Sequence, residues 1–277
     1  MSLPGRTGRR RPSISDLAPS RDKGIGSLQI IIDDVSRTKT AANDRVVVVG
    51  RRQDENTDWV IDELPDWQHA IYVVDDDDTA APLRVAKNKG KESGVYLQYI
   101  VDHYDRLPST IVFLHSHRDG YPEAWHTEFD EHSNPLTVQM LQTDFVQRNG
   151  YANLRCNPTP GCPDEIRPFR ASGSDDHLPE LLFPMVWQTF FNNTNVPEVV
   201  ATPCCAQFAV SRDQVWQRPL SSYRAYHRWL METDLPDDVS GRIMEYMWHI
   251  IFGQDPVYCP DMEQCLEDVY DLGFAFR

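Results

Sequence analysis

Long apolar runs are absent from this 277-residue sequence. No run approaches the roughly 20 apolar residues that span a bilayer. The first residues, MSLPGRTGRRRPSISD, lack the apolar core of roughly 7–15 residues that a signal peptide carries. These absences predict a cytoplasmic protein with no membrane partner.

Positive charge is scarce: 27 Lys and Arg stand against 42 Asp and Glu, for a net charge of −15. Residues 1–23 hold six basic and two acidic residues, a net +4, so the remaining residues carry −19. Such a surface repels nucleic acid on average, because polyanions bind by releasing counterions onto Lys and Arg. We interpret residues 1–43 as a flexible basic N-terminal arm and residues 44–277 as a single α/β catalytic domain.

Cysteine is present in six copies, at positions 156, 162, 204, 205, 259 and 265, but none forms a CxxC motif. The two C-x5-C spacings are weak zinc signals. In a reducing cytoplasm free thiols are expected. The chain also lacks a phosphate-binding loop, and no cofactor or structural metal is expected.

Strands and helices alternate in the first half of the domain. Three apolar, β-branched runs predict strands at 45–51, 69–78 and 109–117, and the segments between them predict helices at 56–64 and 92–108. Crossovers of this length favour parallel pairing, so we expect an α/β fold with a mostly parallel, Rossmann-like sheet flanked by helices.

The second half is less regular. Helices are expected at 135–148 and 178–191, with a Pro- and Gly-rich loop between them. The segment PEVVATPCCAQFAVSRDQV predicts a strand, a turn, a second short strand and a helix with Ser211 as its N-cap. A C-terminal helical portion follows, with helices near 221–233, 238–252 and 262–271.

Polar side chains gather where the predicted strands end, which is the edge that carries the site in open α/β sheets. The first strand ends at Arg51, the second runs into Asp75–Asp78, and the third runs into His115, Ser116, His117, Arg118 and Asp119. Cys204, Cys205 and Gln207 stand near a later strand. Hydrophobic periodicity alone does not require this arrangement, so we interpret these clusters as the lining of a reaction pocket.

His115 and His117 lie two residues apart and would share one face of a strand. Three interpretations remain open for them: ligands of a transition metal, substrate binding or general-base catalysis, and plain hydrogen bonding to the scaffold.

The order of strand, helix, IYVVDDDD, helix and IVFLHSH resembles the nucleotide-sugar glycosyltransferases of the GT-A type. Those enzymes hold a divalent metal on a diphosphate with an Asp-x-Asp after such a strand. His115 and His117 occupy the places of the two aspartates here. Imidazoles suit Mg²⁺ and Mn²⁺ less well than carboxylates do, which weakens this reading.

Three longer segments carry a more specific resemblance: RVVVVGRRQDENTDWV, NKGKESGVYLQYIVDHYDRLPSTIVFLHSH and CCAQFAVSRDQV. Over about residues 45–255 the chain resembles a fungal family defined only as a domain of unknown function, and the arginine-containing cyclodipeptide synthases within it. The resemblance implies an aminoacyltransferase of secondary metabolism that condenses arginyl-tRNA with a second aminoacyl-tRNA into a diketopiperazine. A glycosyltransferase-like enzyme and an inert binding protein are the alternatives.

That reaction leaves two catalytic routes open. A covalent route needs a nucleophile that holds the first aminoacyl group, for which Cys204, Cys205 and Ser116 are candidates. A direct route needs a base for the attacking α-amine, which His115 or His117 could supply.

Binding residues follow from the same chemistry. A guanidinium group is best recognised by carboxylates, so Asp75, Asp76 and Asp78 are the main candidates for arginine, although such a run is also typical of a solvated loop. The remaining predicted substrate-binding residues are Glu92, Asp102, Arg118, Asp119, Gln207 and Glu245. Lys87, Lys89 and Lys91 precede a helix N-terminus and, with Arg51, are the candidates for tRNA contact.

Overall fold

The structure is a computed structural model that describes residues 44–75, 81–170 and 177–272. All of them belong to one unit, Ala41–Arg277. The predicted arm, residues 1–43, lies outside the described residues, as do Asp76 and Asp78.

A five-stranded mixed sheet forms the centre, with the strand order β2-β1-β3-β5-β4. β1 (Arg45–Arg51) pairs in parallel with β2 (Gln68–Val73) and with β3 (Thr110–Leu114). β5 (Phe208–Ser211) runs antiparallel to both β3 and β4 (Tyr151–Asn153). The α/β class and the three parallel strands are confirmed, and the antiparallel strand β5 makes the sheet mixed.

Alternate residues of the central strands enter two different cores. Val46 and Val48 of β1 face one apolar cluster, whereas Val47 and Val49 face the other. Side chains of a strand alternate between its two faces, so a strand that is apolar throughout must be covered on both sides. This explains why the run VVVV in the sequence folds as a central strand.

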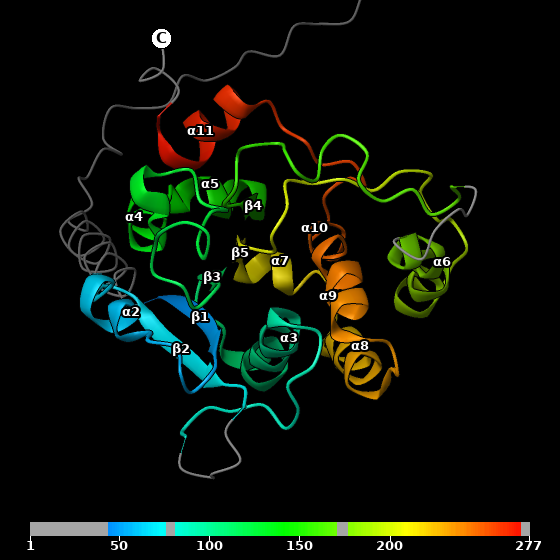
Figure 1. The fold of residues 1–277 in the computed structure, drawn as a ribbon, viewed down its shortest axis with the longest axis horizontal. Coiled ribbons are helices and arrows are strands. Elements are labelled where there is room, and N and C mark those ends of the chain that lie inside the picture. Colours follow the sequence, from blue (N-terminus) through cyan, green and yellow to red (C-terminus); the bar gives the residue numbers. More distant parts are fainter. Residues whose placement is uncertain (1–43, 76–80, 171–176, 273–277) are drawn as a thin grey trace, which may run out of the picture. The chain divides into compact units, whose positions relative to one another are not determined.

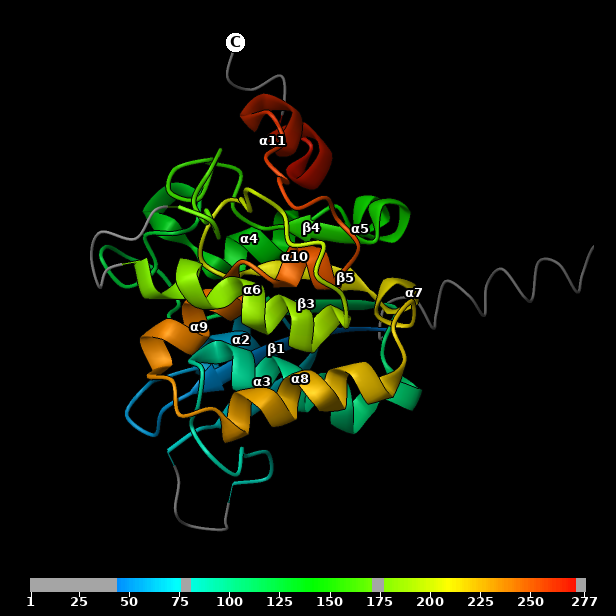
Figure 2. The ribbon, with the colours of Figure 1, turned by 90° about the vertical axis from the view of Figure 1, so that its right-hand side faces the viewer.

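Helices cover both faces (Figures 1 and 2). Residues of α3 (Glu92–His103), α6 (Leu178–Phe191), α8 (Leu220–Glu232), α9 (Asp237–Glu245) and α10 (Trp248–Ile251) pack in the cluster with Val46 and Val48. Residues of α2 (Asp58–Glu63), α4 (Asn134–Met140), α5 (Thr143–Asn149) and α11 (Met262–Tyr270) pack in the other. Short helices at Tyr104–Arg106, Asp130–His132 and Arg212–Val215 (α7) complete the elements. No helix of the described residues combines the length and apolarity that a bilayer crossing requires.

Two helices predicted as continuous are broken. Between α4 and α5 the backbone amide of Gln142 donates to the carbonyl of Val269 at 2.8 Å, a tertiary bond that the local pattern does not encode. The segment 238–252 likewise divides into α9 and α10 at Tyr246 and Met247. Ser211 caps α7 as predicted, with its side chain accepting from the amide of Gln214.

The expectation of free thiols is wrong for this structure. Cys156 is bonded to Cys265 and Cys162 to Cys259, so the two C-x5-C segments are joined to each other. Cys204 is bonded to its neighbour Cys205, and the described residues contain no free cysteine. Spacing alone does not reveal such pairing, because six cysteines allow about 15 connectivities.

The antiparallel direction of β5 determines where the site forms. Phe113, near the carboxyl end of β3, pairs with Phe208, the first residue of β5. The residues just before β5 therefore reach the sheet edge where β1, β2 and β3 end. This brings Cys204 and Cys205 to the edge that carries His115 and His117.

Candidate functional site

Two cavities of about 350 and 360 Å³ lie at this edge of the sheet and share part of their walls. Both are lined by Lys91, Glu92, His115 and His117. The first, called here the basic cavity, adds Gly50, Arg51, Arg52, Glu55, Val74, Asn88, Val95 and Ser116. The second, called here the acidic cavity, adds Glu123, Trp125, His126, Pro160, Cys204, Cys205, Asp238, Gly241, Arg242 and Glu245.

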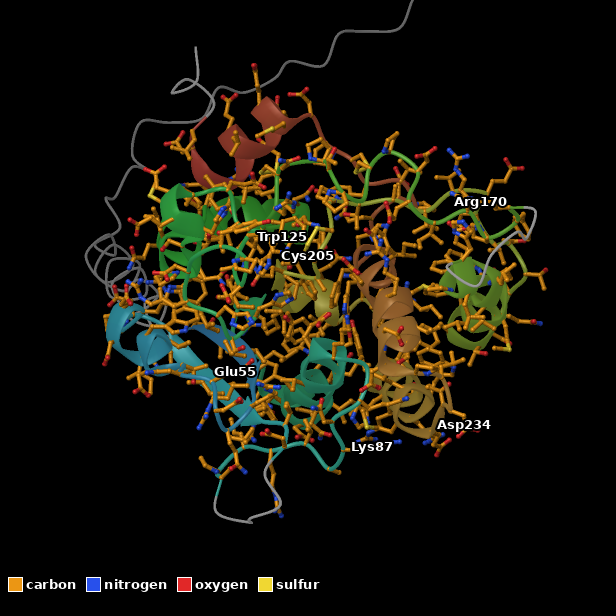
Figure 3. All side chains as sticks on the ribbon, in the orientation of Figure 1. Glu55, Lys87, Trp125, Arg170, Cys205 and Asp234 are labelled. Carbon is orange, nitrogen blue, oxygen red and sulfur yellow. A yellow bond between two sulfur atoms is a disulfide. The ribbon has the colours of Figure 1, made fainter. Side chains whose placement is uncertain are left out.

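The shared wall comes from two segments that are distant in sequence. His115 and His117 directly follow β3, whereas Lys91 and Glu92 stand at the start of α3. Figure 3 labels Glu55 of the basic cavity and Trp125 and Cys205 of the acidic cavity. The arrangement matches the expectation that a site lies beyond the carboxyl ends of the parallel strands.

His115 is a neutral imidazole. Burial, with the nearby His126 and His117, lowers the pKa of His115 to about 3. Its Nε2 atom is buried without a hydrogen-bond partner. A ring with this pKa is too weakly basic to hold a proton near neutral pH.

His126 packs against His115 and is a site residue that the sequence prediction missed. The two rings meet edge to face with centroids 4.5 Å apart. Burial and the charge of Arg155 lower the pKa of His126 to about 4. Its position in the loop after β3, within the segment FLHSHRDGYPEAWH, was the available signal.

Gln207 fixes the backbone at the end of β3. Its Oε1 accepts the amide of His115 at 2.8 Å, and its Nε2 donates to Oδ1 of Asn134 at 3.1 Å. Ser116 is similarly held, because its carbonyl accepts the indole N–H of Trp59 at 3.1 Å. Gln207 is thus placed to position His115, and it is absent from the lining of both cavities.

Glu92 is the carboxyl group common to the two cavities. Burial, reinforced by the charge of Glu245, raises the pKa of Glu92 to about 7. A carboxyl group of this kind exchanges a proton near neutral pH, which ordinary glutamates do not. The geometry therefore offers Glu92 as a general base or acid at the junction of the cavities.

Glu245 is held in place on two sides. Its Oε1 accepts the amide of Cys205 at 2.6 Å, and its Oε2 accepts NH1 of Arg242 at 3.0 Å. The other arm of Arg242 is paired with Glu165. Arg242 was missed from the sequence, because its helix looked like core and the partner carboxylate lies 77 residues away.

The assignment of Cys204 and Cys205 as possible nucleophiles is wrong for this oxidised form, because each sulfur is bonded to the other. The same bond also affects whether these cysteines can bind a metal ion. Within the described part of the chain, Cys204, Cys205 and Glu245 form a group of potential ligands within 4.8 Å of one another. Disulfide sulfurs are not thiolates, so the group lacks the donors that zinc prefers while the bond exists.

The three predicted tRNA-binding lysines differ in their surroundings. Lys87 donates to the carbonyl of Met231 at 3.3 Å, and Lys89 is buried and paired with Asp237 at 3.3 Å. These bonds join the loop before α3 to the end of α8 and to the start of α9. Lys87 and Lys91 are both exposed, and of the three lysines Lys91 lines the two cavities.

Arg51 lines the basic cavity, but its NH1 donates to the carbonyls of Arg52, Gln53 and Glu55, which shapes the loop after β1. Neighbouring Arg52 is paired with Asp54 at 2.7 Å.

Several predicted substrate-binding residues lie away from both cavities. Asp75 accepts the amide of Gln53 at 2.8 Å and is exposed. Asp102 is exposed towards the far end of α3, where it accepts from Gln98 at 2.8 Å. Arg118 pairs with Glu63 and with Asp119. These carboxylates already have protein partners, and none of the four lines the site.

Fold and site together define an α/β protein with a bipartite pocket whose two halves differ in charge. Residues 47–268 match the family model described as "Protein of unknown function (DUF3431)". The match covers most of the chain, which therefore belongs to this family. Neither the curated proteins nor the solved structures contain a match to the chain.

Proposed function

We propose that this chain is an arginine-containing cyclodipeptide synthase, an aminoacyltransferase that joins arginine to a second amino acid, both delivered on tRNA. The observation that carries the proposal is the shared wall of Lys91, Glu92, His115 and His117 between two cavities. A condensation of two acyl groups needs two binding spaces whose reacting ends meet at common catalytic groups.

The acidic cavity suits the arginyl side chain. Glu92, Glu123, Asp238 and Glu245 line it, against the cations Lys91 and Arg242. A guanidinium group binds carboxylates through paired, charge-assisted hydrogen bonds. These residues replace Asp75 as the candidates for arginine selection.

The basic cavity suits the 3′ end of a tRNA. Arg51, Arg52, Asn88 and Lys91 supply donors for phosphate and ribose oxygens. In an acidic chain such a local cluster is the feature that polyanion binding requires. Lys89 no longer belongs to the proposed contact surface, since it is buried and paired with Asp237, whereas exposed Lys87 stays a candidate outside the two cavities.

Glu92 is the proposed base. With a pKa raised to about 7, it can take the proton from the α-ammonium group of one substrate. The free amine then attacks the ester carbonyl of the other substrate, an amide bond forms, and the tRNA 3′-oxygen leaves with a proton. A second attack of the same kind closes the ring. His115, which stays neutral, hydrogen-bonds the reacting groups and does not act as the base.

The direct route fits the oxidised site best. Ser116 is the one earlier nucleophile candidate that keeps a nucleophilic atom, because Cys204 and Cys205 are bonded to each other. Replacing Ser116 by Ala tests the covalent route. If Ser116 carries the first aminoacyl group, the variant should lose turnover and should yield no trapped aminoacyl enzyme.

Mass spectrometry of small molecules tests the proposal. Cells that express the chain should contain a new ion at the mass of a cyclic Arg-Xaa dipeptide, which vector controls lack. Purified protein should make the same product from arginyl-tRNA and mixed aminoacyl-tRNAs, and ribonuclease should abolish the product. A folded protein that yields no such ion in either setting overturns the proposal.

The proposal also assigns the chain to the cytoplasm, where aminoacyl-tRNAs are made. Disulfides are uncommon there, so the three bonds of this structure must be shielded or reduced in the cell. Counting thiols by alkylation and mass spectrometry, on chain isolated from its native compartment, checks this. Isolation from a secretory fraction alone contradicts the cytoplasmic assignment.

The position of His115 and His117 after β3 supports a second candidate, a GT-A-like glycosyltransferase. His115 and His117 directly follow the parallel strand β3, where the sequence resemblance places the Asp-x-Asp of those enzymes. Against it, buried neutral His115 is a poor substitute for a magnesium-binding carboxylate. Transfer from a nucleotide sugar with Mn²⁺, abolished by EDTA and insensitive to ribonuclease, would favour this candidate.

A further inference from the structure

The bond between Cys204 and Cys205 differs in kind from the other two disulfides. Cys156–Cys265 and Cys162–Cys259 join residues 109 and 97 positions apart, whereas Cys204 and Cys205 are adjacent. In the chain-entropy view a disulfide stabilises by closing a loop, and the gain grows with loop length. A bond between neighbours closes almost no loop, so its presence calls for an explanation other than stapling.

The pair lies in the wall of the acidic cavity, where a small reagent can reach it. Cys205 is half-buried, whereas Cys204 is 1% exposed. A thiolate that enters the cavity therefore meets the Cys205 sulfur first. Figure 3 labels Cys205 next to Trp125, which lines the same cavity.

The turn that carries the pair is anchored at both ends. On one side the amide of Cys204 donates to the carbonyl of Pro160 at 3.1 Å, and Asn153 donates to the carbonyl of Pro203 at 2.8 Å. On the other side Gln207 is fixed by its bonds to the backbone of His115 and to Asn134. A change at the sulfurs is thereby confined to the residues between the anchors.

Between the anchors the backbone adopts a disfavoured conformation. Cys205 has φ 88° and Ala206 has φ 51°, both in the left-handed region that residues with a Cβ rarely occupy. The tertiary anchors and the bond between neighbouring side chains together restrict these two residues. Breaking the bond would remove one of these two restraints on Cys205 and Ala206.

Movement of Cys205 would reach two groups of the site directly. The amide of Cys205 donates to Glu245 at 2.6 Å, and Cys205 lines the same cavity as the imidazole of His115, whose pKa its backbone influences. The position of this one peptide unit therefore sets the surroundings of both side chains.

We propose that Cys204 and Cys205 form a reversible redox site that controls the geometry of the acidic cavity. A small dithiol attacks Sγ of Cys205, forms a mixed disulfide and releases the Cys204 sulfur as a thiolate. The second thiol of the reagent then displaces Cys205. The protein gains two electrons and two protons as two thiols, and the dithiol leaves as its cyclic disulfide. This inference stands independently of the reaction proposed for the site.

The experiment titrates the full oxidised chain with dithiothreitol, quenches it with iodoacetamide and maps alkylated cysteines by mass spectrometry. We expect Cys204 and Cys205 to be alkylated first, while Cys156–Cys265 stays intact and the far-UV circular dichroism is unchanged. Hydrogen exchange of the Cys205 amide should become about tenfold faster or more on reduction, as its bond to the charged Glu245 is lost. Reoxidation should restore the slow rate.

Two double variants serve as matched controls. Cys204→Ala with Cys205→Ala should fold and show no response of segment 204–207 to dithiothreitol. Cys162→Ala with Cys259→Ala removes a bond whose two residues are also partly exposed, yet should leave the response of segment 204–207 as in wild type. Reduction of Cys204–Cys205 only together with loss of the fold, or equal exchange of the Cys205 amide in both redox states, overturns the proposal.

Discussion

The basic and acidic cavities are nearly equal in volume and meet at the same four side chains, but they differ in what surrounds that wall. Beyond the shared residues, the basic cavity has two arginines and one glutamate, whereas the acidic cavity has three carboxylates and one arginine. A site of this kind separates two tasks. In the proposed function, the shared wall acts on both substrates and the unshared walls distinguish them.

Replacing Glu92 by Gln should have the largest effect, because it changes the shared wall. Loss of a general base costs about 10²–10⁴-fold in turnover. The base works in its deprotonated form, so the wild-type rate should rise with pH through about 7, the raised pKa of Glu92, and then level off. The variant should lose this rise. Initial rates between pH 5.5 and 8.5 check both statements.

Asp102→Asn is the matched control for Glu92→Gln, because Asp102 lies on the same helix but is exposed and away from both cavities. Its rate and pH profile should equal those of the wild type. A normal pH profile in Glu92→Gln would remove Glu92 from the role of base and with it the chemical function of the shared wall.

Acid pH should affect the two cavities differently, because the buried imidazole of His126 lines the acidic cavity and not the basic one. The pKa of His126 is about 4 in the folded chain and about 6.5 when unfolded. The unfolded state therefore binds the proton more strongly, and the free energy of unfolding falls as pH drops from about 6.5 to about 4. From that difference, His126 contributes up to about 3 kcal/mol of acid destabilisation.

Urea unfolding at pH 4.5 and pH 7.5 gives the free energy of unfolding at each pH. Between pH 7.5 and pH 4.5 this free energy should fall less in His126→Asn than in the wild type. Arg52→Gln, in the basic cavity, should keep the wild-type loss. If the two variants behave alike, His126 is not a buried neutral group and the electrostatic contrast between the cavities is wrong at this point.

The next largest effect is expected from replacing the imidazoles of the shared wall. His115→Ala and His117→Ala should each lower turnover, by about 10²-fold if each supplies one hydrogen bond in the transition state. Both variants should keep the wild-type melting temperature to within a few degrees, which circular dichroism checks. Full activity in both variants would refute the assignment of this sheet edge as the reaction site.

The sequence points to residues of both cavities, Arg51 and Ser116 in the basic one and Cys204, Cys205 and Glu245 in the acidic one, but the backbone of the basic cavity is the easier part to predict. β1 ends at Arg51 and α3 begins at Glu92, as their periodicity predicts, because a strand covered on both faces and an amphipathic helix have local signatures. The parallel pairing of the first three strands follows from the crossover lengths. Together these determine most of the basic wall.

The acidic wall depends on long-range contacts. Its residues come from segments around 123–126, 160, 204–205 and 238–245, which the antiparallel strand β5 and the cysteine pairing bring together. The three-residue strand β4 is too short to show periodicity, and connectivity of six cysteines is not encoded in their spacing. Arg242 was missed for the same reason, since its partner Glu165 lies 77 residues away in the sequence.

The smallest expected effects test the contrast between the unshared walls. Glu123→Gln and Asp238→Asn, both exposed at the acidic cavity, should each raise KM for the arginyl substrate about tenfold and leave kcat nearly unchanged, because each removes one charged hydrogen bond to the guanidinium group. Arg52→Gln should instead raise KM for the second aminoacyl-tRNA.

Pairing one variant from each wall decides whether the cavities act separately. Asp238→Asn combined with Arg52→Gln should show additive free-energy changes, since the two residues share no partner in the structure. Equal effects of each single variant on both substrates would mean that the two spaces bind a single ligand. The shared wall would then be the middle of one site, and a reaction between two acyl groups would lose its structural basis.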